Sequence, residues 1–317
     1  MKAWTRLALA TVATLGISAH AVAETVKVAI GQRGNWDTAV SELGQRGGIF
    51  KKHDLELELL YTQGGGETQQ AVISGSVDIG VAAGTLGVLG AFSKGAPVRI
   101  IGAQSTGAAD YWYVRGDSPV TSLKDAPAGT TVAYSTNGSS THSVALGLAE
   151  QYKPNLRLVA TGSPPGTFTQ VMSGQITVGW ASPPFAFDAL AANRIRIVAR
   201  ANDIEAIRTQ SIRALIANLR FIETKKPLLE RYMRAYRETV DWMYSSDDAL
   251  KIYAEFANTD LASARRVRDD FITKPMLDPD RISGLDALMA DAVTFKAISA
   301  PLPADRQAEL MRIPPRQ

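Results

Sequence analysis

Short apolar runs alternate with helical patterns along about the first two thirds of the chain. The apolar runs are four to seven residues long and lie at 26–30, 55–60, 77–81, 98–104, 131–134, 156–159, 176–180 and 195–199. Runs of this length predict short buried strands. Helical patterns at about 37–52, 67–74 and 85–94 separate the first four runs. Strands that alternate with helices predict an α/β architecture.

From Lys225 onward the pattern changes to helices alone. Apolar side chains recur there at helical spacing, at Leu229, Tyr232, Met233, Tyr236, Val240 and Met243. This spacing predicts a helix with one apolar face.

Residues 57–80 are repeated at 156–179 without a gap. Eight of the 24 aligned pairs are identical, namely Leu57/Leu156, Leu59/Leu158, Thr62/Thr161, Thr68/Thr167, Val72/Val171, Ser74/Ser173, Gly75/Gly174 and Gly80/Gly179. Ordinary composition gives roughly two identities by chance. Each copy reads as a strand, a loop, a helix and a second strand, and Gly75 and Gly174 stand where a helix needs a left-handed last residue. The repeat predicts two similar lobes.

The first 23 residues have the pattern of a secretion signal. Lys2 and Arg6 form a basic start, no acidic residue precedes Glu24, and residues 7–17 are apolar or small. Ala21-Val22-Ala23 then supplies small side chains where a signal peptidase cleaves. The apolar run is too short to span a bilayer, which needs about 20 residues. We therefore expect residues 1–23 to be cleaved; a buried first helix is the alternative.

Composition narrows the chemistry further. Cysteine is absent, which excludes disulfides, thiolate metal sites, a cysteine nucleophile and a lipid-modified N-terminal cysteine. The three histidines are His20, His53 and His142, so we expect no metal site, and no other cofactor is indicated. After removal of the signal, 32 basic residues face 31 acidic ones, a net charge of +1. No block of five like charges occurs, so we expect no nucleic-acid partner.

Three segments carry a resemblance to a known family. Residues 70–81 read Gln-Ala-Val-Ile-Ser-Gly-Ser-Val-Asp-Ile-Gly-Val, residues 48–53 read Gly-Ile-Phe-Lys-Lys-His before a strand, and residues 93–98 lead into the fourth strand. Together they resemble type II periplasmic solute-binding proteins of the sulfonate, nitrate and taurine group. The resemblance covers the mature chain up to about residue 220. It implies a monomeric, non-enzymatic, periplasmic protein that delivers a small solute to the permease and ATPase subunits of an ABC importer.

The resemblance also implies a domain arrangement. Two α/β lobes, each a mixed sheet flanked by helices, would be joined by two extended hinge crossings near 111–115 and 211–218. Residues 24–112 would form the first part of lobe one, and residues 113–213 would form lobe two. Residues 214–317 would complete lobe one, with the C-terminal helices returning to it. The second copy of the repeat falls wholly inside lobe two.

Loops that follow strands and open helices are the candidate solute site, because open α/β sheets bind ligands beyond the carboxyl ends of their strands. The candidate residues in these loops are Gln32, Asn35, Trp36, Gly84, Thr85, Ser135, Gly138, Ser139, Ser140, Thr141, Trp180 and Ser182. Free backbone N–H groups and hydroxyls at a helix start favour an anion such as a sulfonate, nitrate, taurine or a carboxylate. A neutral heterocycle is the alternative solute. Ser139 and Ser140 have the alternative role of helix caps, and Trp36 and Trp180 that of core residues.

Other functions compete with an ABC binding protein. A serine hydrolase would need Ser139 or Ser140 beside His142, but neighbours at one helix start do not present a nucleophile to a base, and the chain has no Gly-x-Ser-x-Gly elbow. Enzymes of the same fold that make the thiamine pyrimidine precursor carry a cysteine-rich stretch, which this chain lacks. A solute receptor for a TRAP-type transporter or a sensor kinase stays open, because such a protein would look much alike.

Overall fold

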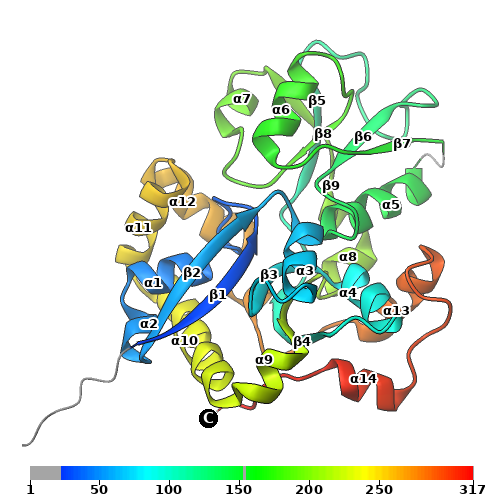
Figure 1. Ribbon diagram of the computed structural model, residues 1–317. Helices are drawn as coiled ribbons and strands as arrows, with labels where there is room; N and C mark the ends of the chain where they lie inside the picture. Colours follow the sequence, from blue (N-terminus) through cyan, green and yellow to red (C-terminus); the bar gives the residue numbers. More distant parts are fainter. Residues whose placement is uncertain (1–22, 153–154, 317) are drawn as a thin grey trace, which may run out of the picture.

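The computed structural model describes residues 23–152 and 155–316, so the expected signal segment, residues 1–23, lies outside the described residues except for its last one. Two groups of strands, each flanked by helices, form an upper and a lower part of the molecule (Figure 1). Within the described part of the chain, no helix combines the length and apolar character needed to cross a bilayer.

The lower part contains a sheet of five strands in the order β2–β1–β3–β10–β4. Its strands are β1 (Glu24–Gly31), β2 (Leu55–Thr62), β3 (Ile79–Gly84), β4 (Val98–Ser105) and β10 (Arg213–Asn218). Strand β1 runs parallel to β2 and β3, whereas β10 runs antiparallel to β3 and β4. Strand β10 therefore inserts between two strands that precede it by more than a hundred residues.

The upper part contains two small sheets. The first has the order β8–β5–β9, with β5 (Tyr111–Arg115), β8 (Gly179–Ala181) and β9 (Ile195–Arg200). In the second, β6 (Thr131–Tyr134) pairs in parallel with β7 (Arg157–Ala160). The two segments expected as crossings lie largely in strands: 111–115 forms β5 in the upper part, and 211–218 contains β10 in the lower part. The chain passes between the two parts beside these strands, at residues 106–110 and 210–212.

Helices cover the sheets in both parts. The lower part has α1 (Val40–Arg46), α2 (Ile49–Lys52), α3 (Gly65–Ile73) and α4 (Thr85–Ser93), and the upper part has α5 (Ser140–Tyr152), α6 (Pro164–Met172), α7 (Phe187–Ala191) and α8 (Glu205–Thr209). The C-terminal part contributes α9 (Leu219–Thr224), α10 (Lys226–Ser245), α11 (Asp247–Ala257), α12 (Leu261–Arg266), α13 (Leu285–Thr294) and α14 (Ala304–Leu310). The helix expected over 37–52 is divided because Gly48 adopts a left-handed φ of 74°, which ends one helix and opens the next.

Buried apolar side chains form three clusters. One packs α10 and α11 against the larger sheet, and another packs α4, α13 and α14 on it. The remaining cluster contains only residues between Ala108 and Ile212. We call this segment lobe two and the rest of the described chain lobe one. The six apolar residues of the predicted stripe from Leu229 to Met243 are all buried in α10, which confirms that prediction.

The two copies of the sequence repeat have the same structure. One copy forms β2, α3 and β3, and the other forms β7, α6 and β8. In lobe one the hydroxyls of Thr62 and Thr68 are hydrogen-bonded at 2.8 Å, and in lobe two those of Thr161 and Thr167 at 2.6 Å. Gly75 and Gly174 end their helices with φ of 76° and 79°. The prediction of left-handed glycines at both helix ends is therefore confirmed.

Candidate functional site

A small polar cavity lies where loops of the two lobes meet. We call it the inner cavity; it is lined by Gly31, Gln32, Asn35, Thr38, Gly65, Ala82, Ser135, Ser139, Ser140, Thr141 and Arg213. Its volume is about 10 Å³, which is close to the space that one water molecule requires. Six of the twelve residues expected at the site border it, namely Gln32, Asn35, Ser135, Ser139, Ser140 and Thr141.

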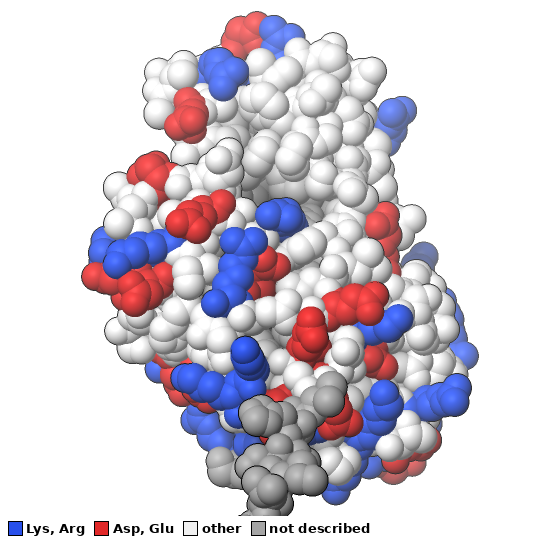
Figure 2. All heavy atoms as spheres, turned by 60° about the vertical axis from the view of Figure 1, so that its left-hand side comes forward, with Lys and Arg blue, Asp and Glu red and all other residues white. Residues whose placement is uncertain are grey.

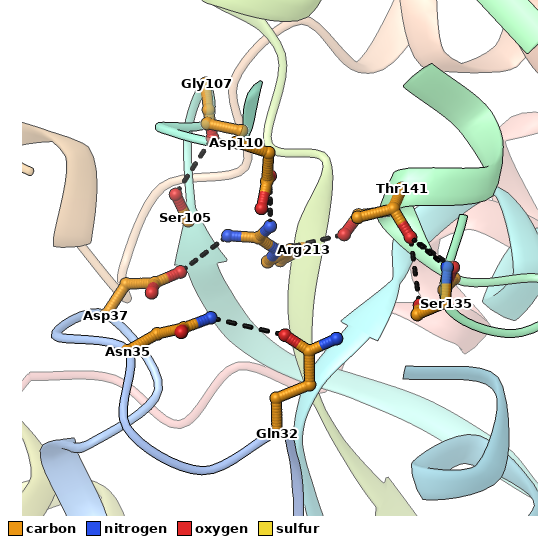
Figure 3. A network of polar contacts seen from close by, with 12 residues as sticks. Gln32, Asn35, Asp37, Ser105, Gly107, Asp110, Ser135, Thr141 and Arg213 are labelled. Atoms are coloured by element: carbon orange, nitrogen blue, oxygen red, sulfur yellow. Dashed lines mark hydrogen bonds and ion pairs between the residues drawn. The ribbon is translucent and has the colours of Figure 1, made fainter. Parts of the chain in front are cut away.

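Arg213 lines the inner cavity and contacts side chains of both lobes (Figure 3). Its Nη1 donates to Asp37 at 2.6 Å, its Nη2 donates to Asp110, and its Nε donates to the Ser140 hydroxyl at 2.9 Å. Asp37 follows β1, Asp110 precedes β5, and Ser140 opens α5 in lobe two. All four side chains are buried. One guanidinium of lobe one therefore contacts Asp37 in its own lobe and both Asp110 and the helix start at Ser140 in lobe two.

The charges around Arg213 do not leave a free cation for an anionic solute. Two carboxylates accompany one guanidinium, so the cluster carries −1 when Asp37 and Asp110 are both ionised. Burial raises the pKa of the Asp110 carboxyl, and the attraction of Arg213 offsets part of that effect. With Asp110 protonated the cluster would be neutral. The cluster of Arg213, Asp37 and Asp110 therefore offers the expected anion no net electrostatic attraction.

The start of α5 is a closely bonded turn. The Ser139 hydroxyl accepts from the N–H of His142 at 3.2 Å, which is the bond that an N-cap serine makes. The Thr141 hydroxyl accepts from the N–H of Ser135 at 2.9 Å. The capping alternative for Ser139 is therefore supported, while Ser140 has the separate role of binding Arg213.

His142 is part of this turn and does not activate a serine. Its Nδ1 accepts from the N–H of Gly138 at 3.3 Å, and its ring stacks on Tyr134 with centroids 4.3 Å apart. Burial lowers the pKa of the His142 imidazole, so the ring stays neutral and keeps its acceptor nitrogen at neutral pH. Among the described residues, His142 has a hydrogen bond to one serine hydroxyl, that of Ser139, and it makes this bond with its backbone N–H.

Glycines of lobe one meet the backbone of lobe two along a line that we call the glycine seam. A Cβ atom built on Gly84 or Gly87 would lie 2.4 Å or 2.3 Å from the carbonyl oxygen of Gly138. A Cβ on Gly66 would lie 2.1 Å from the carbonyl oxygen of Asn137. Only glycine allows this approach, so the lobes touch backbone to backbone. Gly84 and Gly138, which were expected at the site, meet in this seam.

The four other expected residues line neither the inner cavity nor the larger cavity described next. Trp36 and Trp180 are fully buried in the hydrophobic clusters, and the Trp36 indole donates to the Tyr244 hydroxyl at 3.0 Å. They have the core role that was the alternative. Thr85 donates to the carbonyl oxygen of Ser211 at 2.6 Å, and Ser182 is buried.

A second, larger cavity opens between the lobes on the face shown in Figure 2, where the surface is hollowed between its upper and lower parts. We call it the outer cavity; its volume is about 930 Å³. Lobe one borders it with residues 33–35 and with residues of α11 and α12, and lobe two with residues of 165–169, 184–189 and with Arg194. Asn35 borders both cavities. Among the residues that the structure describes, no group of His, Cys, Asp and Glu side chains could hold a metal ion.

Sequence reasoning missed Arg213, its two carboxylate partners and most of the outer cavity. Arg213 did carry a signal, because it is a charged residue that opens a strand whose next four residues, 214–217, are apolar. A charge buried in a strand needs a partner. No sequence pattern, however, shows that Asp37 and Asp110 supply it.

Two lobes that enclose a cavity beyond the ends of their strands and are joined by two connections define the type II periplasmic binding fold. Solved structures with this fold match nearly the whole chain. The alkanesulfonate-binding protein SsuA from Xanthomonas axonopodis pv. citri, bound to MOPS, has a TM-score of 0.74 at 17% identity, covering 92% of this chain and 98% of that one. The nitrate-binding protein NrtA from Synechocystis PCC 6803 has a TM-score of 0.68 at 13% identity, covering 90% and 84%.

The chain belongs to the NMT1/THI5-like family, whose model matches residues 37–249. Among curated protein sequences, none is similar enough to count as a relative. The desulfurization enzyme DSZB shares the fold, with a TM-score of 0.62 at 15% identity over 90% of this chain and 96% of that one. The fold therefore occurs in enzymes as well as in binding proteins, and the site itself has to separate the two.

Proposed function

We propose that the protein is the periplasmic solute-binding component of an ABC importer, that it captures a small solute between its lobes, and that it delivers this solute to a permease. The observation that carries the proposal is that residues of both lobes border the inner and the outer cavity, with polar side chains around Arg213 at the inner one. A site divided between two lobes binds tightly only when they close. A transporter that recognises the closed form would therefore recognise the protein with its solute bound.

The proposed mechanism is equilibrium closure. The lobes would rotate about the connections 106–110 and 210–212, at the two ends of lobe two. A solute that contacts both lobes binds the closed form more tightly than the open form, and this difference in affinity shifts the population toward the closed form. The contact between Arg213 and Ser140 would form only in the closed form. A TRAP-type transporter or a sensor kinase remains the alternative recipient of the same closed form.

The residues of the site favour binding over catalysis. The Ser139 and Ser140 hydroxyls already accept hydrogen bonds from His142 and Arg213, and His142 Nδ1 accepts from the backbone. A nucleophile requires a base within hydrogen-bond reach of its own proton, and neither serine has one among the described residues. The absence of cysteine likewise argues against the thiamine-precursor enzymes.

The proposed function is tested by finding the solute and measuring closure. A thermal-shift screen with sulfonates, nitrate, taurine, aromatic carboxylates and pyrimidines should give at least one hit, since a ligand at about a hundredfold excess over its Kd stabilises the native state by ~2.7 kcal/mol. Small-angle scattering with that ligand should then show a smaller radius of gyration. An unchanged profile under saturating ligand would contradict capture by closure.

Export is tested separately. Mass spectrometry of periplasmic protein should show a chain that begins at or within about two residues of Glu24, because signal peptidase reads the small side chains before it. Recovery of only the full-length chain, from the cytoplasm, would overturn the proposed location.

A further inference from the structure

Three phenylalanine rings border the outer cavity from lobe two. Phe168 and Phe185 meet edge to face, with ring centroids 6.0 Å apart and an interplanar angle of 79°. Phe187 borders the same cavity. All three rings are only half-buried, so apolar ring surface faces the cavity. Covering that surface with another ring would add edge-to-face contact to the gain from apolar burial.

Two arginines border the same cavity, one from each lobe. The Arg33 guanidinium lies over the ring of Phe256 at 4.7 Å and over that of Tyr61 at 5.4 Å. The Arg194 guanidinium lies over Phe168 at 5.9 Å. Neither makes an ion pair with a carboxylate in residues 23–152 and 155–316. A guanidinium is flat and stacks on rings, and both arginines are exposed, so each can contact a further ring.

The charges of the outer cavity nearly balance. Its lining includes the carboxylates of Asp188, Glu255 and Asp260 beside Arg33 and Arg194. Asp260 is already engaged, because it accepts from the N–H of Ser263 at 2.9 Å at the start of α12. Exposed charges of both signs give little long-range attraction for a solute of either sign. Ring contacts, and not net charge, should therefore decide the affinity.

The volumes of the two cavities decide which of them can hold the body of a solute. The inner cavity, at about 10 Å³, takes no more than a group of the size of a water molecule. The outer cavity, at about 930 Å³, lies in the range of pockets that bind drug-sized ligands, roughly 300–1,000 Å³. The body of a solute fits the outer cavity, with its polar end toward Asn35, which borders both cavities.

We propose that the outer cavity is a subsite for an aromatic ring, so that the solute is a small ring-bearing molecule with one polar end. The ring lies against Phe168 and Phe185 in lobe two, and the guanidinium of Arg33 covers it from lobe one. This inference rests on the proposed function, and it names the class of solute that the same cleft takes.

Calorimetry with matched pairs of probes tests this inference on the mature protein. The pairs are benzoate and acetate, benzenesulfonate and methanesulfonate, and benzamide and acetamide; within each pair a phenyl group takes the place of a methyl group. In every pair that binds, the ring-bearing member should bind at least about tenfold more tightly. Raising the salt from about 0.05 M to about 0.5 M should change its affinity by less than about threefold.

Two substitutions assign the effect to the outer cavity. Phe185→Leu keeps an apolar side chain but removes the ring, and it should reduce the advantage of the ring-bearing probe to less than about threefold. Phe295→Leu is the matched control, because Phe295 is also half-buried but packs beside α13 in the third cluster. It should leave the advantage unchanged. Phe168→Leu replaces Phe185→Leu if the latter does not fold.

The outcomes separate the two proposals. Equal affinities within the pairs, or an unchanged ring advantage in the Phe185 variant, overturn the aromatic subsite while solute capture stands. A ring advantage that disappears at high salt also overturns it, in favour of charge recognition. If neither these probes nor the screen above gives any binding or closure, both proposals fail.

Discussion

Replacing Gly87 with alanine should hold the lobes apart and weaken solute binding by about a hundredfold, or ~2.7 kcal/mol. The new Cβ would lie 2.3 Å from the carbonyl oxygen of Gly138, and a backbone atom cannot move aside as a side-chain end can. Gly87 lies inside α4, where alanine is the better helix former by about 1 kcal/mol. Folding stability should therefore be kept or increased while closure is blocked.

Gly147→Ala is the matched control for this variant. Gly147 also lies inside a helix, α5, but its Cβ would meet only the Cδ1 atom of Ile204, at 3.1 Å and within lobe two. This variant should gain helix stability and keep the parent's affinity. Calorimetry gives the affinities, and small-angle scattering with ligand should show an open form for Gly87→Ala alone. Parental affinity in Gly87→Ala would mean that the glycine seam is not needed for closure.

Replacing Arg213 with methionine should lower the free energy of unfolding by about 3–5 kcal/mol, because it leaves two buried carboxylates without their cation. The loss should depend on pH. Burial already raises the pKa of Asp110, and removal of the opposing guanidinium raises it further. A carboxyl with a raised pKa in the folded state binds protons better there than in the unfolded chain, so acid favours folding. The loss should therefore be smaller near pH 5 than near pH 8.

Urea unfolding of the parent and the variant at both pH values measures this loss. Adding Asp110→Asn to Arg213→Met should recover part of the stability, since only one unpaired carboxylate then remains. Arg99→Met is a comparison with a second buried arginine, whose partner Glu309 is one-third exposed. Its loss should be smaller. A loss below about 1 kcal/mol for Arg213→Met, or one that is equal at both pH values, would show that the cluster around Arg213 is not a paired buried unit.

Local patterns in the sequence were sufficient for most of the strands and for the repeat. The run at 131–134 coincides with β6, and both left-handed glycines were placed correctly, because a buried strand and a helix end are decided by neighbouring residues. The segments expected as extended crossings, 111–115 and 211–218, contain β5 and β10. Tyr111–Arg115 and Arg213–Asn218 have strand-forming sequences, but partners far away in the sequence decide which sheet a strand joins.

The sequence also predicted only part of the candidate site, because distant residues complete it. The rule that ligands bind beyond the carboxyl ends of strands placed Asn35 and Ser140 at the inner cavity. It could not find Arg213 with its partners, because Asp37 and Asp110 come together only through the tertiary fold. Trp36 was misleading, because a tryptophan beside a polar loop has the same sequence pattern whether it faces a cleft or the core.

The central position of β10 has a consequence for how the chain is made. A ribosome supplies β3 and β4 long before residues 213–218, and all of lobe two is synthesised in between. Until then the facing sides of β3 and β4 carry unpaired N–H and C=O groups, which are templates for pairing with another chain. Lobe one therefore cannot complete its sheet during most of translation. During this delay the unpaired strand edges can pair with other chains, which is the situation in which chaperones act.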